Sequence, residues 1–417
     1  RHRRASSRDL VPPRHLSGAN PREALVNTRE GTNGFAIWRV GGWRAVRNSP
    51  PGHRRRGPEL RSSTWQMSTH VFSIHRMLTI LALVVSTNAI RRHGNKLVDD
   101  SGATVRLKGV GYMGTEYECV SESGRIFSGP ADAKIITAWK LWGINAVRLP
   151  MNEDCWLGIN GAPLAATAYR TALVNFTTLA ATSGITVILD LHWTSTNASL
   201  AKAQEPMMSS TSLQFWEDLA TEPALRHSGI VFELFNEPFG FEAWRNASER
   251  LEPSCFVNGT GCVYAGYQQG VDVVRAAGWK GLILIGTDDW SFDLDFVVAN
   301  PPTDPLDNLA LSWHPYEFKK GPPSCAAWGC HGLGDAAMAA GWPVVMTEFG
   351  PEDDSSRPNM SYVDGVYEWA RRSDVSGMLA WVWMPGHGHL RLLAPDSDFY
   401  GSEASVWGRS WKQFSFY

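Results

Sequence analysis

The 417-residue sequence predicts one α/β domain over residues 90–417, a (β/α)8 TIM barrel with a short N-terminal hairpin. Two observations lead to this prediction. Eight short apolar runs recur after residue 106, with helical stretches between most of them, and polar or aromatic residues stand at the ends of six of the runs. Apolar strands alternating with helices indicate a parallel sheet that is buried on both faces. Eight such units favour closure into a barrel over an open sheet.

The first 89 residues differ from the rest in composition. Residues 1–66 hold 14 Arg, no Lys and four acidic residues, without apolar periodicity, and we interpret them as a disordered leader or a region upstream of the true start codon. Residues 67–89 resemble a signal peptide, because the apolar stretch Leu78–Val85 is too short to span a bilayer and is followed by the small residues Thr87 and Ala89. A buried helix or strand is the alternative for so short a run.

A signal peptide implies a secreted, extracellular protein with no membrane contact after cleavage. The net charge of the whole chain is −2. Residues 1–66 carry a net charge of +10 and residues 67–89 one of +1, so residues 90–417 carry −13. An acidic domain is repelled by phosphate backbones, so nucleic acid is excluded as a partner. We expect a monomer.

The elements follow in a regular order from residue 96. Residues Lys96–Leu107 alternate around Asp100-Ser-Gly102, which predicts a hairpin. The eight predicted strands are Leu107–Gly111, Asn145–Leu149, Thr186–Leu191, Ile230–Phe235, Gly281–Ile285, Leu309–Trp313, Val344–Glu348 and Met378–Trp383. The predicted helices are Asp132–Trp142, Ala165–Thr182, Ser212–Ala220, Tyr267–Ala277 and Tyr362–Arg372. No internal repeat or second domain is evident.

Catalytic groups of such a barrel lie just past the C-terminal ends of its strands. A polar residue after one buried strand often serves only local hydrogen bonding, but six strands that end this way indicate a shared site. The residues concerned are Arg148, His192, Asn236, Glu237, His314, Tyr316 and Glu348, with Trp381 and Trp383 on the last strand.

Glu237 and Glu348 carry the chemistry of this prediction. They follow the fourth and seventh strands, which face each other across an eight-stranded barrel. Hydrolysis of a glycosidic bond with retention needs two carboxyl groups about 5–5.5 Å apart, one protonated and one ionised. Each glutamate alone could instead cap a loop or pair with an arginine.

Five motifs in order make the chain resemble glycoside hydrolase family 5, the cellulase family. They are Val147-Arg-Leu-Pro150, Asp190-Leu-His-Trp193, Asn236-Glu-Pro238, Trp313-His-Pro-Tyr316 and Thr347-Glu-Phe-Gly350. The resemblance covers roughly residues 95–417. It implies that Glu348 is the nucleophile and Glu237 the acid/base, and that Asn236 binds the sugar 2-hydroxyl.

The same resemblance implies supporting roles for other residues. Arg148 and Tyr316 match the partners of the nucleophile, His192 and His314 match site histidines, and a tryptophan of the eighth strand matches the floor of the −1 subsite. The strand reads Ala380-Trp-Val-Trp383, and we favour Trp383 over Trp381 because it lies nearer the strand end. Aromatic faces stack on sugar rings, and further candidates in loops at the barrel mouth are Trp156, Trp193, Trp290 and Trp328.

The substrate that these motifs favour is β-1,4-glucan, attacked internally. The alternatives are another β-glycan (mannan, xyloglucan, β-1,3-glucan or a glycolipid glycan) or a barrel that binds carbohydrate without catalysis, although neither catalytic glutamate is missing. We expect no cofactor. We also expect no metal site, because His387 and His389 have no Cys or carboxylate partner at ligand spacing.

The six cysteines all follow the proposed cleavage point, as disulfides of a secreted protein would require. We predict that Cys119 pairs with Cys155, Cys255 with Cys262 and Cys325 with Cys330. Five glycosylation sequons agree with secretion, at Asn175, Asn197, Asn246, Asn258 and Asn359.

Overall fold

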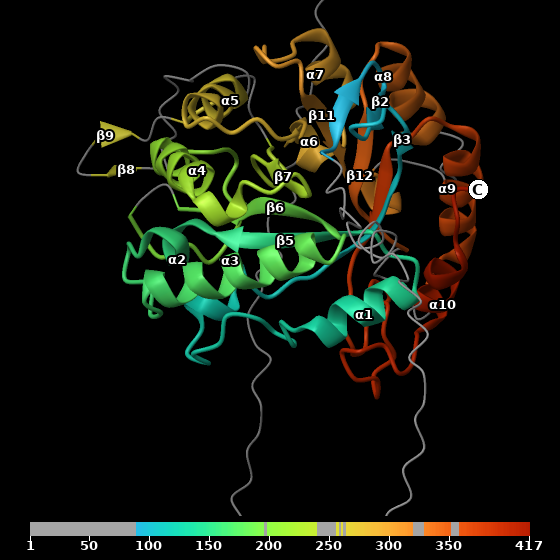
Figure 1. Ribbon diagram of the computed structural model, residues 1–417, viewed down its shortest axis with the longest axis horizontal. Coiled ribbons are helices and arrows are strands. Elements are labelled where there is room, and N and C mark those ends of the chain that lie inside the picture. Colours follow the sequence, from blue (N-terminus) through green and yellow to red (C-terminus); the bar gives the residue numbers. More distant parts are fainter. Residues whose placement is uncertain are drawn as a thin grey trace, which may run out of the picture. The chain divides into compact units, whose positions relative to one another are not determined.

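The computed structural model describes residues 89–195, 198–239, 256–257, 260–261, 264–319, 329–351 and 358–417. Eight parallel strands close into a barrel in the order β10-β11-β12-β13-β4-β5-β6-β7, with β7 paired to β10, which confirms the predicted fold (Figure 1). They are β4 (Leu107–Gly111), β5 (Ala146–Asn152), β6 (Thr186–Trp193), β7 (Ile230–Glu233), β10 (Ile283–Ile285), β11 (Leu309–Trp313), β12 (Val344–Phe349) and β13 (Gly377–Ala380). The predicted leader and residues 67–88 of the predicted signal peptide lie outside the described residues.

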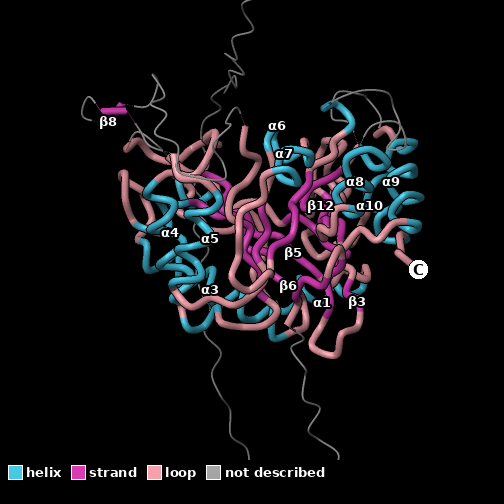
Figure 2. Tube along the Cα trace, turned by 90° about the horizontal axis from the view of Figure 1, so that it is seen from above, coloured by secondary structure: helices cyan, strands magenta, loops and turns pink. Residues whose placement is uncertain are grey.

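Helices surround the strands (Figure 2), and side-chain caps explain where several of them begin. Asp132 accepts hydrogen bonds from the first turn of α1, Ser209 forms a capping box with Ser212 in α4, and Asn359 caps α9. The α-helices are α1 (Ala133–Leu141), α2 (Glu153–Leu157), α3 (Ala166–Thr182), α4 (Ser210–Thr221), α5 (Tyr267–Ala276), α6 (Asp288–Ser291), α7 (Leu294–Ala299), α8 (Asp335–Ala339), α9 (Met360–Arg372) and α10 (Val406–Gln413). None of the described helices combines the length and the apolar composition that crossing a membrane requires.

Short elements complete the fold. The predicted hairpin is part of a three-stranded antiparallel sheet of β1 (Arg91–His93), β2 (Lys96–Val98) and β3 (Thr104–Val105). A second small sheet pairs β8 (Phe256–Val257) with β9 (Thr260–Gly261). The single-turn helices are η2 (Glu118–Val120), η3 (Pro223–Leu225), η4 (Glu317–Lys319) and the π-helical η5 (Gly329–Gly334).

The barrel interior is filled in layers, because every second residue of a strand points inward. An apolar layer lies near the N-terminal ends of the strands and packs against Ile90 and Leu97 of the N-terminal segment. The strands contribute Leu107, Ala146, Ile188, Val231, Leu282, Leu284, Ala310, Val345 and Leu379. Two residues farther along the same strands stand Arg148, Asp190, Glu233, Ser312 and Thr347, all of them buried. The apolar layer therefore supports a polar layer just below the barrel mouth.

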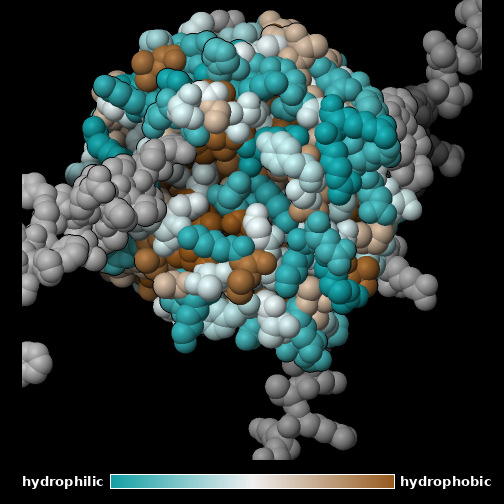
Figure 3. Space-filling model, turned by 45° about the vertical axis from the view of Figure 1, so that its right-hand side comes forward, coloured by the Kyte–Doolittle hydropathy of each residue, from teal (hydrophilic) through white to brown (hydrophobic). Residues whose placement is uncertain are grey.

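One predicted disulfide joins the loops at this mouth. Cys119 in η2, after β4, is bonded to Cys155 in α2, after β5, as predicted. Cys330 is disulfide-bonded as well. Cys255, Cys262 and Cys325 lie outside the described residues. In the view of Figure 3 the surface is mostly hydrophilic, and some hydrophobic residues show in hollows near its centre.

Candidate active site

The buried guanidinium of Arg148 is the centre of the polar layer. Its Nε lies 2.7 Å from Glu233 Oε2 and its Nη2 lies 3.2 Å from Glu233 Oε1, so the guanidinium binds this carboxylate through two hydrogen bonds. Nη2 also contacts Asp190 Oδ2 at 3.0 Å, and Nη1 donates to Glu348 Oε1 at 2.5 Å. A single fully buried cation therefore holds three carboxylates, each on a different strand.

Glu348 has two charge-stabilising donors. Besides Arg148, the Tyr316 hydroxyl donates to Glu348 Oε2 at 3.0 Å. The pairing of β12 with β13 shifts register between Met346 and Phe349. A bulge of this kind redirects side chains, and both Thr347 and Glu348 contact groups inside the barrel although they are neighbours in the chain.

Glu237 has a different environment. It follows β7 in a backbone conformation with φ of 47°, which is uncommon for a residue other than glycine. The Gln204 amide holds this turn by donating to the Glu237 carbonyl oxygen at 2.8 Å. Burial raises the pKa of the Glu237 carboxyl above its usual value, although Lys319, His192 and Arg148 oppose the shift. The site thus favours a protonated Glu237 beside a Glu348 that is held by cationic and hydroxyl donors.

The two carboxyl groups are close together. One ligand oxygen of Glu237, one of Glu348 and a ring nitrogen of His314 all lie within 4.8 Å of one another. The imidazole Nδ1 of His314 is 2.9 Å from Glu237 Oε1 and 3.8 Å from Glu348 Oε2. This separation leaves room for the anomeric carbon of a sugar between the carboxyl groups, and it is shorter than the roughly 6.5–9.5 Å that an intervening water requires.

His192 and Asn236 complete the mouth on the side of β6. His192 Nδ1 lies 2.7 Å from Asp190 Oδ2, and burial lowers the pKa of His192 to about 4, so the ring is neutral. Burial raises the pKa of Asp190 to about 7, against the influence of Arg148. Asn236 Oδ1 accepts from Arg148 Nη2 at 2.8 Å, which directs the Asn236 amide N–H groups away from the guanidinium and toward His192 Nε2, at 3.5 Å. The amide is thereby oriented to donate at the mouth.

The expectation for Trp383 is wrong. Strand β13 ends at Ala380, so the two-residue alternation of a strand does not determine where Trp383 points. The Trp381 ring stacks against His192 with parallel planes and a centroid distance of 5.9 Å. The Trp383 ring is fully buried, packs edge-on against Trp142 and donates from Nε1 to the Phe399 carbonyl oxygen. Trp381 lines the site, and Trp383 belongs to the core.

A glycine gives the Trp381 ring its position. A Cβ atom at Gly111, on the neighbouring strand β4, would overlap ring atoms of Trp381. The close approach of the ring to the strand therefore depends on the missing side chain.

The other candidate tryptophans also differ in whether they are buried in the core or exposed. Trp156 follows β5 on the mouth side of the barrel, but it is buried, donates to Asp218 and packs against Phe215, so it presents no face to a sugar. Trp193 at the end of β6 is half-buried, and Trp290 is 41% exposed and stacked on Phe239. Trp328 lies outside the described residues.

Several residues of the site were not among the expected ones. They are Gln204, which reaches Glu237 from the loop after β6, and the polar layer residues Asp190, Glu233, Ser312 and Thr347. A sequence signal exists for Asp190 and Ser312, since each precedes an expected histidine by two residues and therefore shares its face of the strand.

In the described part of the chain, one group of side chains is close enough together to bind a metal ion, and it consists of Glu237, His314 and Glu348. A cation there would compete with the Arg148 guanidinium, which already binds Glu348. The donor set therefore fits proton and glycosyl transfer better than metal binding. His387 is exposed, outside this group.

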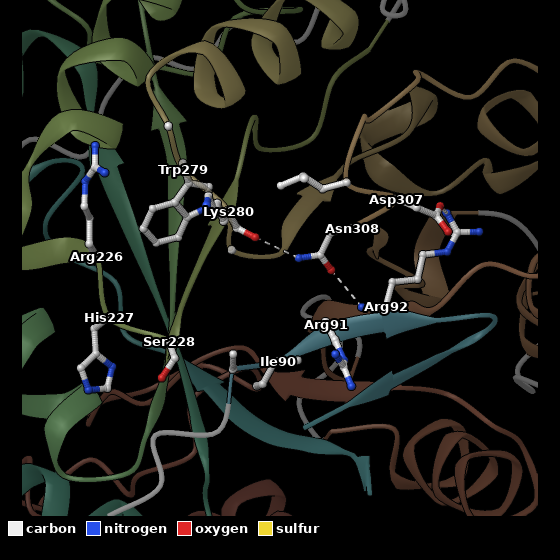
Figure 4. Close-up of a pocket in the computed structure, with 14 residues that line it drawn as sticks. Ile90, Arg91, Arg92, Arg226, His227, Ser228, Trp279, Lys280, Asp307 and Asn308 are labelled. Carbon is white, nitrogen blue, oxygen red and sulfur yellow. Dashed lines mark hydrogen bonds and ion pairs between the residues drawn. The ribbon is translucent and has the colours of Figure 1, made fainter. Parts of the chain in front are cut away.

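A cavity of about 670 Å³ lies at the end of the barrel opposite to the catalytic residues (Figure 4). Its lining residues come from the segment leading into β1 and from the turns that precede β7, β10 and β11, including Arg92, Ser228, Lys280 and Asn308. Residues that precede the strands lie at the N-terminal face, which in barrels of this kind serves stability rather than catalysis.

Known proteins resemble this chain at modest identity. It is 24% identical over 281 residues to an endoglucanase of Clostridium saccharobutylicum, covering 66% of this chain and 52% of that protein. It is 24% identical over 296 residues to endoglucanase A of Butyrivibrio fibrisolvens, covering 70% and 58%. The chain thus spans little more than half the length of these relatives.

Solved structures share the fold. A beta-glucanase from Saccharophagus degradans superposes with a TM-score of 0.58 at 20% identity, covering 78% of this chain and 92% of that one. The catalytic domain of a mannanase from Streptomyces superposes with a TM-score of 0.57 at 19% identity, covering 83% and 96%. Residues 98–387 match the family described as cellulase (glycosyl hydrolase family 5), and the chain belongs to that family.

Proposed function

We propose that the protein is a secreted glycosidase that cleaves internal β-1,4-linkages of glucan with retention, using Glu348 as nucleophile and Glu237 as acid/base. The observation that carries this proposal is that one carboxyl oxygen of Glu237 lies within 4.8 Å of one carboxyl oxygen of Glu348, while the two groups have different environments. Such a separation is typical of double displacement, in which the enzyme itself attacks the sugar.

In the first step Glu348 attacks the anomeric carbon while Glu237 protonates the leaving glycosidic oxygen. Arg148 and Tyr316 hold one oxygen of Glu348 each, so the ionised carboxylate is kept in place for attack. Burial of the Glu237 carboxyl raises its pKa and so favours its proton, as the donor role requires. The product of this step is a glycosyl ester on Glu348 and a free sugar end.

In the second step water attacks the anomeric carbon, and the bond between this carbon and Glu348 breaks, which releases the Glu348 carboxylate. Glu348 has no charge while it is in the ester, which lowers the electrostatic cost of ionising Glu237, and Glu237 now accepts the proton of the water. The Asn236 amide, held by Arg148 and next to His192, is placed to donate to the sugar 2-hydroxyl. Such a bond strengthens as the oxocarbenium-like transition state forms.

The substrate assignment has separate support. The similar curated proteins are endoglucanases, and one structural neighbour is a beta-glucanase in complex with cellotetraose. Trp381, which lies parallel to His192 at the barrel mouth, offers an aromatic ring for a sugar of such a chain. Mannan is the second candidate, because another neighbour is a beta-mannanase with mannohexaose.

Incubation of the full chain with soluble β-glycans tests this proposal. We expect oligosaccharides and a rapid fall in viscosity from carboxymethyl cellulose or mixed-linkage glucan, and no release from a Glu237→Gln/Glu348→Gln double variant. Activity confined to mannan would change the substrate but keep the mechanism. Binding to glucan without any hydrolysis would replace the enzyme with a carbohydrate-binding barrel.

A further inference from the structure

The fully buried imidazole of His314 bridges the acid/base and the polar layer below it. Its Nδ1 lies 2.9 Å from Glu237 Oε1, and its Nε2 lies 2.9 Å from the Thr347 hydroxyl oxygen. Burial lowers the pKa of His314 to about 4, although Glu348 and Glu233 oppose the shift. The ring is therefore neutral, and one nitrogen carries a proton while the other offers a lone pair.

The hydroxyl groups below His314 determine which nitrogen carries the proton. Arg148 donates to both oxygens of the Glu233 carboxylate, so Glu233 Oε1 acts as a hydrogen-bond acceptor toward the hydroxyl groups as well. Ser312 Oγ donates to Glu233 Oε1 at 2.6 Å. The Thr347 hydroxyl is hydrogen-bonded to Ser312 Oγ and also lies 3.2 Å from Glu233 Oε1. Because the Ser312 proton is used on Glu233, the proton between the two hydroxyl oxygens comes from Thr347. The hydroxyl protons of Ser312 and Thr347 are thus directed toward Glu233 and Ser312, respectively, and away from His314.

Thr347 Oγ1 consequently presents a lone pair to the ring. A short contact between this lone pair and Nε2 requires a proton on Nε2, which leaves Nδ1 bare. A bare Nδ1 at 2.9 Å from Glu237 Oε1 is favourable only when Glu237 carries the proton and donates it to the ring.

We propose that Glu233, acting through Ser312 and Thr347, fixes the Nε2–H tautomer of His314 and so holds Glu237 in its protonated form. Glu233, Ser312 and Thr347 are positioning residues, since none of them reaches the space between the two catalytic carboxyl groups. The inference rests on the proposed function because it takes Glu237 as the acid/base.

We call the chain of contacts from Glu233 through Ser312 and Thr347 to His314 the relay. It serves both steps of the proposed reaction. Before attack it supplies an acceptor for the proton that Glu237 must keep. After that proton has gone to the leaving group, the bare Nδ1 faces an ionised carboxylate, which makes Glu237 a stronger base toward water. No proton moves along the relay.

Thr347→Val removes the hydroxyl at nearly constant volume and leaves the Arg148–Glu233 pair in place. Nε2 then loses its acceptor, the proton moves to Nδ1, and Nδ1–H donates to an ionised Glu237. The pKa of Glu237 should fall, because a donor now stabilises its charged form. The other groups that face Glu237 and His314 stay the same in this variant: Arg148, His192, Gln204, Lys319, Glu233 and Glu348.

The test combines two readouts on the full chain. The ¹⁵N spectrum of labelled histidine, assigned by comparison with His314→Gln, should show Nε2–H at His314 in the native protein and in Thr347→Ser, and Nδ1–H in Thr347→Val. The alkaline limb of the kcat/KM profile should move down by about one pH unit in Thr347→Val and return in Thr347→Ser. Thr177→Val is the matched control, because Thr177 is also buried and its hydroxyl has no partner among the described residues.

An Nδ1–H signal in the native protein, or an unchanged tautomer in Thr347→Val, overturns the relay. If the tautomer changes in Thr347→Val but the alkaline limb of its kcat/KM profile does not move, the relay has no influence on the protonation of Glu237. The tautomer of His314 is measured without substrate. If the protein hydrolyses no β-glycan, the proposed function is refuted, but the tautomer measurement still tests the relay.

Discussion

The indole of Trp381 lies parallel to the imidazole of His192, with 5.9 Å between the ring centroids. Trp381 follows β13 and His192 lies near the end of β6, so this pair spans the barrel mouth over β4 and β5. With Asn236 and the two glutamates, it outlines the place where the sugar ring at the cleaved bond would lie.

The two tryptophans of this segment should differ when replaced by alanine. Trp381→Ala should lower kcat/KM at least tenfold with a small change in unfolding temperature, because it removes a wall of the site. Trp383→Ala should lower the free energy of unfolding by about 3–5 kcal/mol, since it empties a core position beside Trp142. Kinetics and urea unfolding of both variants decide this, and the reverse pattern would restore Trp383 as the site residue.

Glu153 should make stability depend on pH. It is fully buried, and burial raises the pKa of its carboxyl to about 8 from an ordinary value of 4.5. The folded state therefore binds this proton more tightly than the unfolded state does. The contribution of the bound proton to the free energy of unfolding is complete below pH 4.5 and is lost as pH rises toward 8. Glu153→Gln should flatten the fall in unfolding free energy between pH 5 and 8, measured in urea. The exposed Glu403→Gln is the control, and an equal slope in both variants would contradict the argument.

The mouth disulfide should contribute measurably to stability. The bond between Cys119 and Cys155 closes a loop with a sequence separation of 36 residues. Loops of this size stabilise a fold by about 3–4 kcal/mol through restriction of the unfolded chain. Cys119→Ala/Cys155→Ala should lose about that much in urea unfolding, and an unchanged midpoint would show that the bond does not constrain the chain.

Glu237→Ala and Glu348→Ala should fail in different ways. Each should slow hydrolysis of the natural substrate by at least 10²–10⁴-fold, about the contribution of general acid–base help alone. With an activated aryl glycoside, azide should rescue Glu237→Ala and give the β-glycosyl azide, because azide attacks the ester on Glu348. Azide should rescue Glu348→Ala with the α-linked product, since it enters in place of the nucleophile. Exchanged products would exchange the two roles.

The register of the strands explains how much of this site the sequence could predict. Arg148 and His192 were identifiable because each is a polar residue at or just past the end of an apolar run. Glu237 was identifiable because its strand ends in Asn236-Glu-Pro238. Trp383 was misplaced because the strand and its alternation end at Ala380, three residues before Trp383.

The polar layer was hidden for another physical reason. Glu233 stands between Phe232 and Leu234 in a run that is otherwise apolar, and only the guanidinium of Arg148, on another strand, makes its burial favourable. The bulge in β12 turns both Thr347 and Glu348 inward. Neither the pairing across strands nor the bulge has a local pattern in the chain.

The anomeric configuration of the first product tests the central claim most directly. Proton NMR during hydrolysis of a cello-oligosaccharide by the full chain records the new reducing end before it mutarotates. Double displacement through Glu348 predicts that the β-anomer appears first and the α-anomer follows slowly. An α-anomer formed first would contradict the two-step mechanism and the roles that we assign to Glu237 and Glu348.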